Sequence, residues 1–493
     1  MTTAAAPPAE TAGVLRPCNR CKEQEGTIDL RGAETVCRAC FAYYVSSKAV
    51  KRLEALQRDP ATPRSKGAGG QRRPQRYLVG LSCGPSSTAL LHVLTENVRL
   101  QRARGQKTAR FEYVAVHVVD DTLRPFSSAP SHSPPSSSPS SPSIAGSSEA
   151  DGSALAAYRT RFPEAELLSV PLSSALALPS IDWTALPSPP PASAGLSPAQ
   201  QLAHVLSALP SATSRADVRR LLVRHLLVAT AARRNCDALL LGHSTTSLAE
   251  LTLSETAKGR GFSLPWLVND GAAPLPASIT TTLDDPQTQT QTQTQTQSPD
   301  KDQNDRNTTN GTSKKDPKTR TTTTTSLPIY SPLRELFRKE LVAYLSHASP
   351  PLLDILPAPE AAAGAKKGGG NSGAVVSHRE LSIDDVLSRY FGEVEASYPS
   401  VVANVVRTTG KLLRRPDASN HNHDHDHDHG DNGNNAAGGN SVEGEEGKTC
   451  GLCGAALDAP GDERWRGEIG DRDDGASSSK PGLCYGCERS VRG

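Results

Sequence analysis

The nine residues Tyr77-Leu78-Val79-Gly80-Leu81-Ser82-Cys83-Gly84-Pro85 decide the fold class of this chain. The apolar run 77–81 predicts a buried strand, and the segment 82–84 predicts a tight turn. Pro85 suits the first position of a helix, because its ring presets φ and it has no N–H to leave unpaired. Apolar residues then recur at helical spacing until the chain approaches Gly105. The stretch therefore predicts a strand, a turn and a helix.

Further strands and helices alternate along the chain. Apolar runs predict buried strands at 113–119, 167–172 and 237–243. Apolar residues at helical spacing predict helices at 41–57, 217–234, 248–258 and 333–345. Nearly continuous apolar strands that alternate with helices are typical of a doubly wound parallel sheet. We therefore expect an α/β fold of this class.

The composition sets the limits of the folded units. The chain has 493 residues, of which 36% are hydrophobic and 4% aromatic. Four stretches have a biased composition: 122–150, 271–326, 357–376 and 416–447. The inserts 122–150 and 271–326 and the His/Asp tract at 421–429 are too poor in apolar residues to offset the entropy of ordering, so we predict disorder there. The predicted units are a cysteine module at 14–58, an α/β domain at 76–347, C-terminal helices at 379–415, a His/Asp/Asn-rich linker at 416–447 and a second cysteine module at 448–493.

Charge and hydropathy limit the binding partners and the cellular locations that the sequence allows. Lys and Arg number 54 against 52 Asp and Glu, so a site for a polyanion must be a local patch. The first residues have neither the charged nor the apolar region of a secretory signal. No apolar run reaches the roughly 18 residues that a membrane helix needs. We expect no membrane contact and a cytosolic location, with the nucleus as second choice.

Eight of the ten cysteines form four Cys-x-x-Cys pairs. Two pairs, 15 residues apart, lie near the N-terminus, and two more, 30 residues apart, lie near the C-terminus. Two pairs complete a tetrahedron around Zn²⁺, so we predict two structural zinc sites that are closed to substrate. Iron–sulfur ligation is the alternative, and a redox dithiol is less favoured because such motifs come singly. The predicted ligands are Cys18, Cys21, Cys37 and Cys40, and Cys450, Cys453, Cys484 and Cys487.

The remaining cysteines, Cys83 and Cys236, stand alone beside predicted strands. Cysteine in such a place behaves as a small apolar residue, so a core role is favoured over a sulfur-carrying one. The turn that contains Cys83 lies past the carboxyl end of a strand, where doubly wound sheets bind ligands.

Three segments resemble motifs of the ATP-pyrophosphatase (PP-loop) superfamily. The turn 82–87 looks like its Ser-Gly-Gly-x-Asp-Ser loop, and 241–250 is similar to the Gly-His-x-x-Asp-Asp-x-Ala-Glu motif of tRNA thiolases. The segment 332–341 resembles the later Pro-Leu and Lys-Glu helix of those enzymes. The residues that agree within the first two motifs include Ser82, Gly84, Ser87, Gly242, His243 and Glu250.

The segments depart from these motifs at one glycine and at the acidic residues. Cys83 stands where the backbone must approach phosphate, and Ser86 stands in place of the loop aspartate. Thr246-Ser247 stands in place of the acidic pair. The carboxylates that the resemblance assigns to magnesium and ATP are therefore missing. We expect a degenerate phosphate loop with no catalytic residue, no ATP turnover and at most weak ATP binding.

A degenerate PP-loop domain between two cysteine modules resembles the cytoplasmic tRNA 2-thiolation protein 2 family. The resemblance implies a subunit that forms a heterodimer with a catalytic PP-loop thiolase and has tRNA as a partner. The implied reaction is 2-thiolation of the wobble uridine of cytosolic lysine, glutamate and glutamine tRNAs. The resemblance also implies a Urm1-type ubiquitin-like sulfur carrier and, less firmly, a link to conjugation of that carrier to proteins.

Basic clusters fit an RNA partner, because arginine contacts to phosphate position RNA without reading its sequence. Solvated helix faces are the alternative explanation of any one cluster. Two other functions compete: an active adenylating sulfurtransferase that uses Cys83 or Cys236, and a zinc-knuckle interaction protein. The first needs carboxylates that the motifs lack, and the second does not explain the strand–turn–helix stretch. The RNA-binding candidates are Arg215, Arg219, Arg220, Arg224, Arg414 and Arg415.

Overall fold

A computed structural model describes ten segments of the chain: 16–58, 74–105, 110–123, 152–187, 195–275, 326–357, 381–412, 449–455, 457 and 482–493. Most of the predicted disordered stretches, including the His/Asp-rich tract, lie outside the described residues. Arg414 and Arg415 lie outside them as well. The domain bounds expected from the sequence remain a prediction.

A six-stranded sheet forms the centre of the fold, in the order β5-β4-β3-β6-β8-β7. Neighbouring strands are parallel, except that the edge strand β7 runs antiparallel to β8. The strands are β3 (Gln75–Gly80), β4 (Phe111–Val119), β5 (Glu166–Pro171), β6 (Ala238–Leu241), β7 (Gly271–Pro274) and β8 (Ser326–Tyr330). The expected α/β class with a mostly parallel sheet is confirmed.

The order of the strands creates a switch point at β3. The chain moves from β3 outward to β4 and β5, and then returns to place β6 on the other side of β3. Connections that leave in opposite directions open a crevice at the carboxyl ends of the strands, and doubly wound sheets bind ligands there. The segments after β3 and β6, which carry the two main motifs, both begin at this edge.

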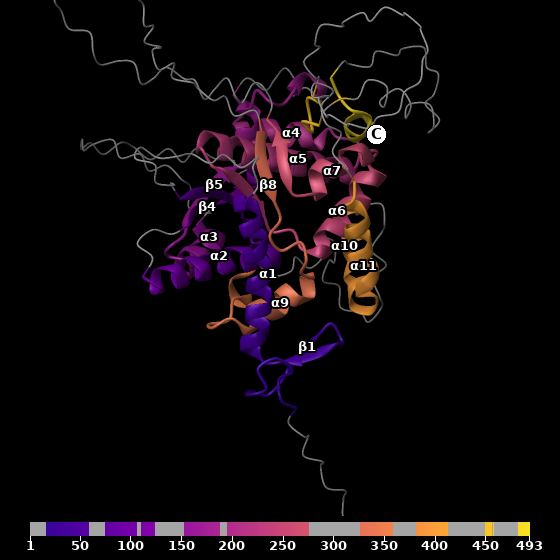
Figure 1. Cartoon of the computed structure of the whole chain (residues 1–493). Helices are drawn as coiled ribbons and strands as arrows, with labels where there is room; N and C mark the ends of the chain where they lie inside the picture. Colours follow the sequence, from indigo (N-terminus) through magenta and orange to yellow (C-terminus); the bar gives the residue numbers. More distant parts are fainter. Residues whose placement is uncertain are drawn as a thin grey trace, which may run out of the picture.

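Helices cover both faces of the sheet (Figure 1). Tyr77 and Val79 of β3 pack in the cluster that contains residues of α1 (Arg38–Arg58), α2 (Pro85–Ala103) and α9 (Arg338–His347). The intervening Leu78 packs on the other face, with residues of α5 (Ala212–Arg233). Alternate side chains of a strand point to opposite faces, so a sheet covered on both faces needs apolar residues throughout.

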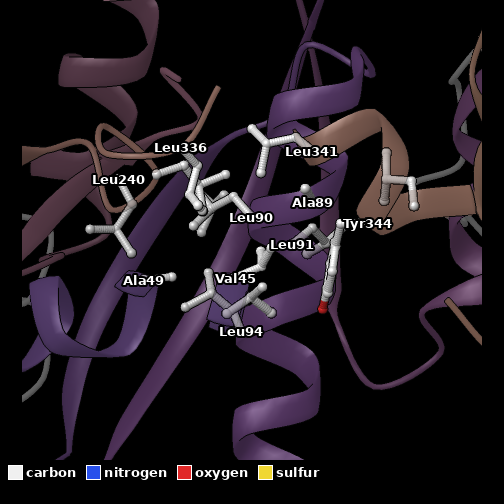
Figure 2. Close-up of a cluster of buried hydrophobic side chains, with 14 of the residues drawn as sticks. Val45, Ala49, Ala89, Leu90, Leu91, Leu94, Leu240, Leu336, Leu341 and Tyr344 are labelled. Carbon is white, nitrogen blue, oxygen red and sulfur yellow. The ribbon is translucent and has the colours of Figure 1, made fainter. Parts of the chain in front are cut away.

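The first face has the larger of these two clusters. Figure 2 shows part of this cluster, in which Leu90 and Leu94 of α2 gather with Val45 of α1 and Leu341 of α9. These four side chains are fully buried or nearly so. The helix that follows the degenerate loop is therefore held from three sides, and its first turn has a defined position at the sheet edge.

Most of the other described elements belong to one of three groups. The N-terminal module contains the hairpin of β1 (Ile28–Leu30) and β2 (Glu34–Val36). Residues of α4 (Pro198–Ser207), α5 and the last helix, α13 (Tyr485–Arg492), share one buried cluster. A further cluster joins α6 (Thr245–Ala257), α7 (Leu264–Val268), α10 (Ile383–Ser397) and α11 (Pro399–Thr409). The remaining helices are α3 (Gly152–Arg161) and five short 3-10 segments: η1 (Asp121–Leu123), η2 (Leu172–Ala177), η3 (Trp183–Ala185), η5 (Gly261–Ser263) and η7 (Leu353–Ile355). No described helix is long and apolar enough to cross a membrane.

Both inserts predicted within the α/β domain contain ordered residues at their ends. The stretch 271–326 begins with β7 and ends with the first residue of β8. Because β7 is an edge strand, Pro274 can lie there without breaking a ladder on both sides. The insert 122–150 begins inside η1. The predicted disorder was wrong at the ends of 271–326, because pairing with the sheet compensates there for an unfavourable composition. It was also wrong at 122–123, which complete a 3-10 turn.

The helix predicted at 333–345 begins later, at Arg338. Its first amides bind partners from other elements. The Arg338 amide donates to Thr246 Oγ1 at 3.1 Å, and the Lys339 amide donates to Glu395 Oε1 at 2.7 Å. Tertiary contacts thus fix the start of α9, and periodicity alone placed it five residues too early.

Candidate functional site

The degenerate loop joins β3 to α2 at the switch point. Gly84 is the N-cap residue of α2 and Pro85 is its first residue. The hydroxyls of Ser82 and Ser87 lie 3.1 Å apart, and Ser87 Oγ donates to the Gly84 carbonyl at 3.1 Å. The loop therefore closes on itself through serine side chains.

The second motif touches the first at Gly242. A Cβ built on Gly242 would lie 2.6 Å from Ser87 Cα and 2.8 Å from the Ser87 amide nitrogen. Only a glycine permits this approach, because both neighbouring atoms belong to the backbone of the first turn of α2. The structure thus brings together the residues that the sequence motifs placed 155 positions apart, from Ser87 to Gly242.

Cys83 is held in an unusual backbone conformation, with φ of 60°, and its side chain is 3% exposed. The Tyr158 hydroxyl donates to the Cys83 carbonyl at 3.1 Å. The Cys83 sulfur lies 3.6 Å from His117 Nδ1, but that nitrogen is also 2.7 Å from the Leu81 carbonyl, to which it can donate. Burial raises the pKa of the Cys83 thiol to about 11, although the Tyr158 hydroxyl opposes the shift. A buried thiol of this kind is a weak nucleophile.

Thr246 lies where the resemblance expects a carboxylate, and protein groups surround its hydroxyl. Thr246 Oγ1 accepts from the Arg338 amide and donates to Glu395 Oε2 at 2.6 Å. Glu395 belongs to α10 and is 4% exposed. This part of the edge therefore serves to hold α9 and α10.

Glu250 of the same motif pairs with Arg338 at 2.6 Å. Burial raises the pKa of Glu250, and its partner Arg338 works in the opposite direction. The Lys339 ammonium donates to the Glu395 carbonyl at 3.1 Å. The two basic residues at the start of α9 are thus engaged by protein oxygens, which leaves them less able to hold a nucleotide phosphate.

His243 of the second motif has a buried Nδ1 that is without a hydrogen-bond partner among the described residues. Burial lowers the pKa of His243 to about 4, and the nearby cations Arg224, Arg220 and Arg334 add to the shift. The imidazole is therefore neutral at physiological pH.

The eight paired cysteines come together in two groups of four, as their spacing predicts. Within each group all ligand atoms lie within 4.8 Å of one another. The sulfurs of Cys21 and Cys37 are 3.8 Å apart, and those of Cys453 and Cys484 are 3.7 Å apart. Zn–S bonds of about 2.3 Å in a tetrahedron place sulfurs about 3.8 Å apart, so both groups fit a four-coordinate metal. Each group could hold a metal ion, and its four sulfurs leave no ligand position for a substrate.

The arginines of α5 have different surroundings. Arg219 pairs with Asp120 at 3.0 Å, and Arg215 Nη1 donates to the Leu209 carbonyl at 3.3 Å. Arg220 pairs with the buried carboxylates of Asp217 and Glu255, which directs its charge into the protein. Arg224 lines a cavity of about 70 Å³ together with Trp266. Arg215 and Arg219 therefore remain the better candidates for RNA contacts.

Sequence reasoning missed two groups of residues. Glu395 was not predicted, because its contact with Thr246 joins elements 149 residues apart. A buried ion network around Arg260 was also missed, since the segment 258–261 predicted only the end of a helix. A charged residue placed directly between two glycines, Gly259 and Gly261, was the one local signal that could have drawn notice.

Together these features define a doubly wound α/β protein with two groups of four cysteines, in which the segments after β3 and β6 meet at one edge of the sheet and hydroxyls stand at 246–247. Residues 382–489 match the family model of the cytoplasmic tRNA 2-thiolation protein 2. A relative of that name from Phaeosphaeria nodorum is 30% identical over 479 residues, which cover 96% of this chain and 94% of the relative. One from Sclerotinia sclerotiorum is 32% identical over 404 residues, or 81% and 83% of the two chains. The chain belongs to the cytoplasmic tRNA 2-thiolation protein 2 family.

Among solved structures, the chain is similar to a U34-tRNA thiolase, NcsA from Methanococcus maripaludis with its 4Fe–4S cluster. The identity is 13% and the TM-score 0.42, over 82% of this chain and 89% of the thiolase.

Proposed function

We propose that this chain is the non-catalytic subunit of a cytoplasmic complex that 2-thiolates the wobble uridine of lysine, glutamate and glutamine tRNAs. Its family membership supports the reaction. The observation that carries the non-catalytic role is the Thr246 hydroxyl, which bonds to the Arg338 amide and to Glu395 where an active enzyme needs a free carboxylate. A catalytic PP-loop thiolase supplies the adenylation step in this proposal, and a Urm1-type carrier supplies the sulfur.

The same proposal assigns roles to the other parts of the chain. The sheet within 76–347 is of the PP-loop type and has lost its ATP chemistry. The cysteine groups within 14–58 and 448–493 hold structural zinc, because four thiolates at tetrahedral spacing suit Zn²⁺ and close the site to substrate. The helices within 379–415 cover the edge of the sheet where the motifs meet.

The test is release of pyrophosphate from ATP in the presence of tRNA, measured for the chain alone, the catalytic subunit alone and the complex. We expect no sustained release by the chain alone, and the fullest thiolation of tRNA by the complex. Cys83→Ala in the complex is expected to leave turnover unchanged, since the buried thiol takes no part. Sustained release by the chain alone, abolished by Cys83→Ala, would show an active adenylating sulfurtransferase instead.

The contribution of α5 to RNA binding is tested by neutralising Arg215 and Arg219 together. Each lost phosphate contact should lower the slope of log affinity against log salt by roughly 0.7 to 0.9. Arg58→Gln is the matched control, because Arg58 is an exposed arginine paired with Glu54 on its own helix. Arg220 is unsuitable for this test, since its replacement breaks buried ion pairs. An unchanged slope for the double variant would remove α5 from the RNA interface.

A further inference from the structure

Arg260 is a fully buried arginine that lies between the α/β domain and the C-terminal cysteine group. Its Nε donates to Glu255 Oε2 at 2.7 Å, and its Nη2 donates to Asp217. On the other side, its Nη1 lies 3.9 Å from the Cys487 sulfur and 3.5 Å from Ser490 Oγ. One guanidinium thus contacts carboxylates of α5 and α6 and a cysteine of the predicted metal site.

The charges around Arg260 balance without the cysteines. The cations Arg220, Lys258 and Arg260 meet three carboxylates, those of Asp217, Glu255 and Asp384. A divalent metal with four thiolates carries a net negative charge, and the Arg260 donor faces one of those thiolates. An N–H donor to a coordinating thiolate offsets part of this charge and orients the ligand.

The backbone also packs closely at this junction. A Cβ on Gly486 would lie 2.7 Å from the Lys258 carbonyl oxygen, and one on Gly259, where φ is +82°, would lie 2.8 Å from Tyr485 Cδ1. His225 Nε2 of α5 is 2.9 Å from the Leu452 carbonyl, next to the ligand Cys453. The cysteine group is therefore embedded in the α/β domain at several points.

The N-terminal cysteine group is attached differently. Arg31 joins its module to the domain by donating to both Glu340 oxygens, at 2.7 and 2.9 Å, and to the Glu335 carbonyl. These partners are carboxylate and carbonyl oxygens, whereas Arg260 also contacts a cysteine sulfur. The Arg31 side chain is 35% exposed, against 0% for Arg260. The two groups thus share the four-cysteine design but differ in how they are built into the fold.

We propose that Arg260 is a positioning residue for the C-terminal metal, and that metal binding there and the packing of α5 and α6 form one cooperative unit. Arg260 contacts the Cys487 thiolate without being a metal ligand. Its hydrogen bonds to Asp217 of α5 and Glu255 of α6 fix its position and so couple the thiolate to these two helices. The N-terminal metal stabilises its own module and leaves α5 and α6 unaffected. This inference does not depend on the RNA or thiolation roles.

The first experiment measures release of Zn²⁺ to a competing chelator from the full chain in a Cys18→Ser/Cys21→Ser background, which isolates the C-terminal site. Arg260→Met alone leaves the three carboxylates facing only two cations, Arg220 and Lys258. The variant is therefore Arg260→Met/Glu255→Gln, which keeps the remaining charges balanced. We expect its affinity for Zn²⁺ to fall by about 10- to 100-fold, the range found for residues that orient metal ligands from the second shell. Arg31→Met is the matched control and should leave the affinity unchanged. Affinity equal to that of the parent chain would overturn the role of Arg260.

The second experiment needs no change at Arg260, so it tests the cooperative unit even if that variant fails to fold. Hydrogen exchange with peptide resolution is measured on the zinc-loaded chain and after chelation. Removal of the C-terminal metal, by chelation in the same background, should speed exchange across Ala212–Arg233 and Thr245–Ala257. Removal of the N-terminal metal, by Cys18→Ser in the natural chain, should leave both helices protected. Equal protection of α5 and α6 with and without the C-terminal metal would refute the cooperative unit.

Discussion

Replacement of Gly242 by alanine tests whether the two motifs meet at the sheet edge as the structure shows. The new Cβ would lie 2.6 Å from Ser87 Cα and 3.1 Å from the Ser86 carbonyl carbon, both backbone atoms of the first turn of α2. Backbone atoms cannot rotate away as a side chain can, so either β6 or α2 must shift. Such overpacking costs about 1 to 3 kcal/mol, and the rigid neighbours place Gly242→Ala near 3 kcal/mol.

The assay is urea unfolding of the zinc-saturated chain, followed by tryptophan fluorescence. With a slope of about 3 kcal/mol per M urea, a loss of about 3 kcal/mol lowers the midpoint by about 1 M. Gly84→Ala is the control in the same loop. Its φ is −82°, and its new Cβ would meet only Ser82 Oγ at 3.5 Å, an ordinary contact. Because alanine is a poorer N-cap than glycine, we expect a loss below about 1 kcal/mol.

Two results would refute this reasoning. An unchanged midpoint for Gly242→Ala would mean that Gly242 does not lie against the first turn of α2. An equal loss for Gly84→Ala would mean that the loop as a whole, and not the contact between Gly242 and Ser87, sets the cost.

Three further predictions concern the buried side chains of His243 and Cys83 and the open space beside Gly392. Burial, with Arg224 beside it, lowers the pKa of His243 to about 4. In the unfolded chain this imidazole is protonated near pH 6.5, so between about pH 6.5 and 4 the unfolded chain binds more protons than the folded chain. The free energy of unfolding should therefore fall as the pH drops through this range. Urea titrations of His243→Gln should show a smaller fall. Burial raises the pKa of Cys83 to about 11, so iodoacetamide at pH 8 should label it far more slowly in the folded chain than in urea, by mass spectrometry, and rapid labelling would contradict its burial. Gly392 is exposed in α10 with nothing near its missing Cβ, so Gly392→Ala should stabilise the chain by about 0.5 to 1 kcal/mol in thermal unfolding, and destabilisation would count against the helix there.

Much of the fold could be predicted from local chemistry. The run 77–81 is apolar at every position because both faces of β3 are covered, and Pro85 marks the start of α2. The four cysteine pairs predicted both tetrathiolate groups, because a Cys-x-x-Cys turn places its two sulfurs together whatever surrounds it. Motifs of this length also sufficed for the resemblance to the family.

Other features depend on contacts between distant elements. The composition of 271–275 argues against a strand, yet β7 forms because β8 offers it an open edge. The start of α9 depends on Thr246 of α6 and Glu395 of α10, which accept hydrogen bonds from the Arg338 and Lys339 amides. The sequence does not distinguish Arg220 from the other arginines of α5. In the structure it pairs with the buried carboxylates of Asp217 and Glu255.

By itself the sequence determined the strands β3, β4, β5 and β6, the turn at 82–84, the members of the two four-cysteine groups and the loss of carboxylates at 246–247, because each is carried by short stretches of chain. Only the tertiary structure decided which groups fill the sheet edge and which arginine faces the C-terminal cysteines. Glu395 reaches Thr246 across 149 residues, and Arg260 reaches Cys487 across 227. Contacts of that span arise from the packing of whole helices on a sheet, and no local pattern of residues specifies them.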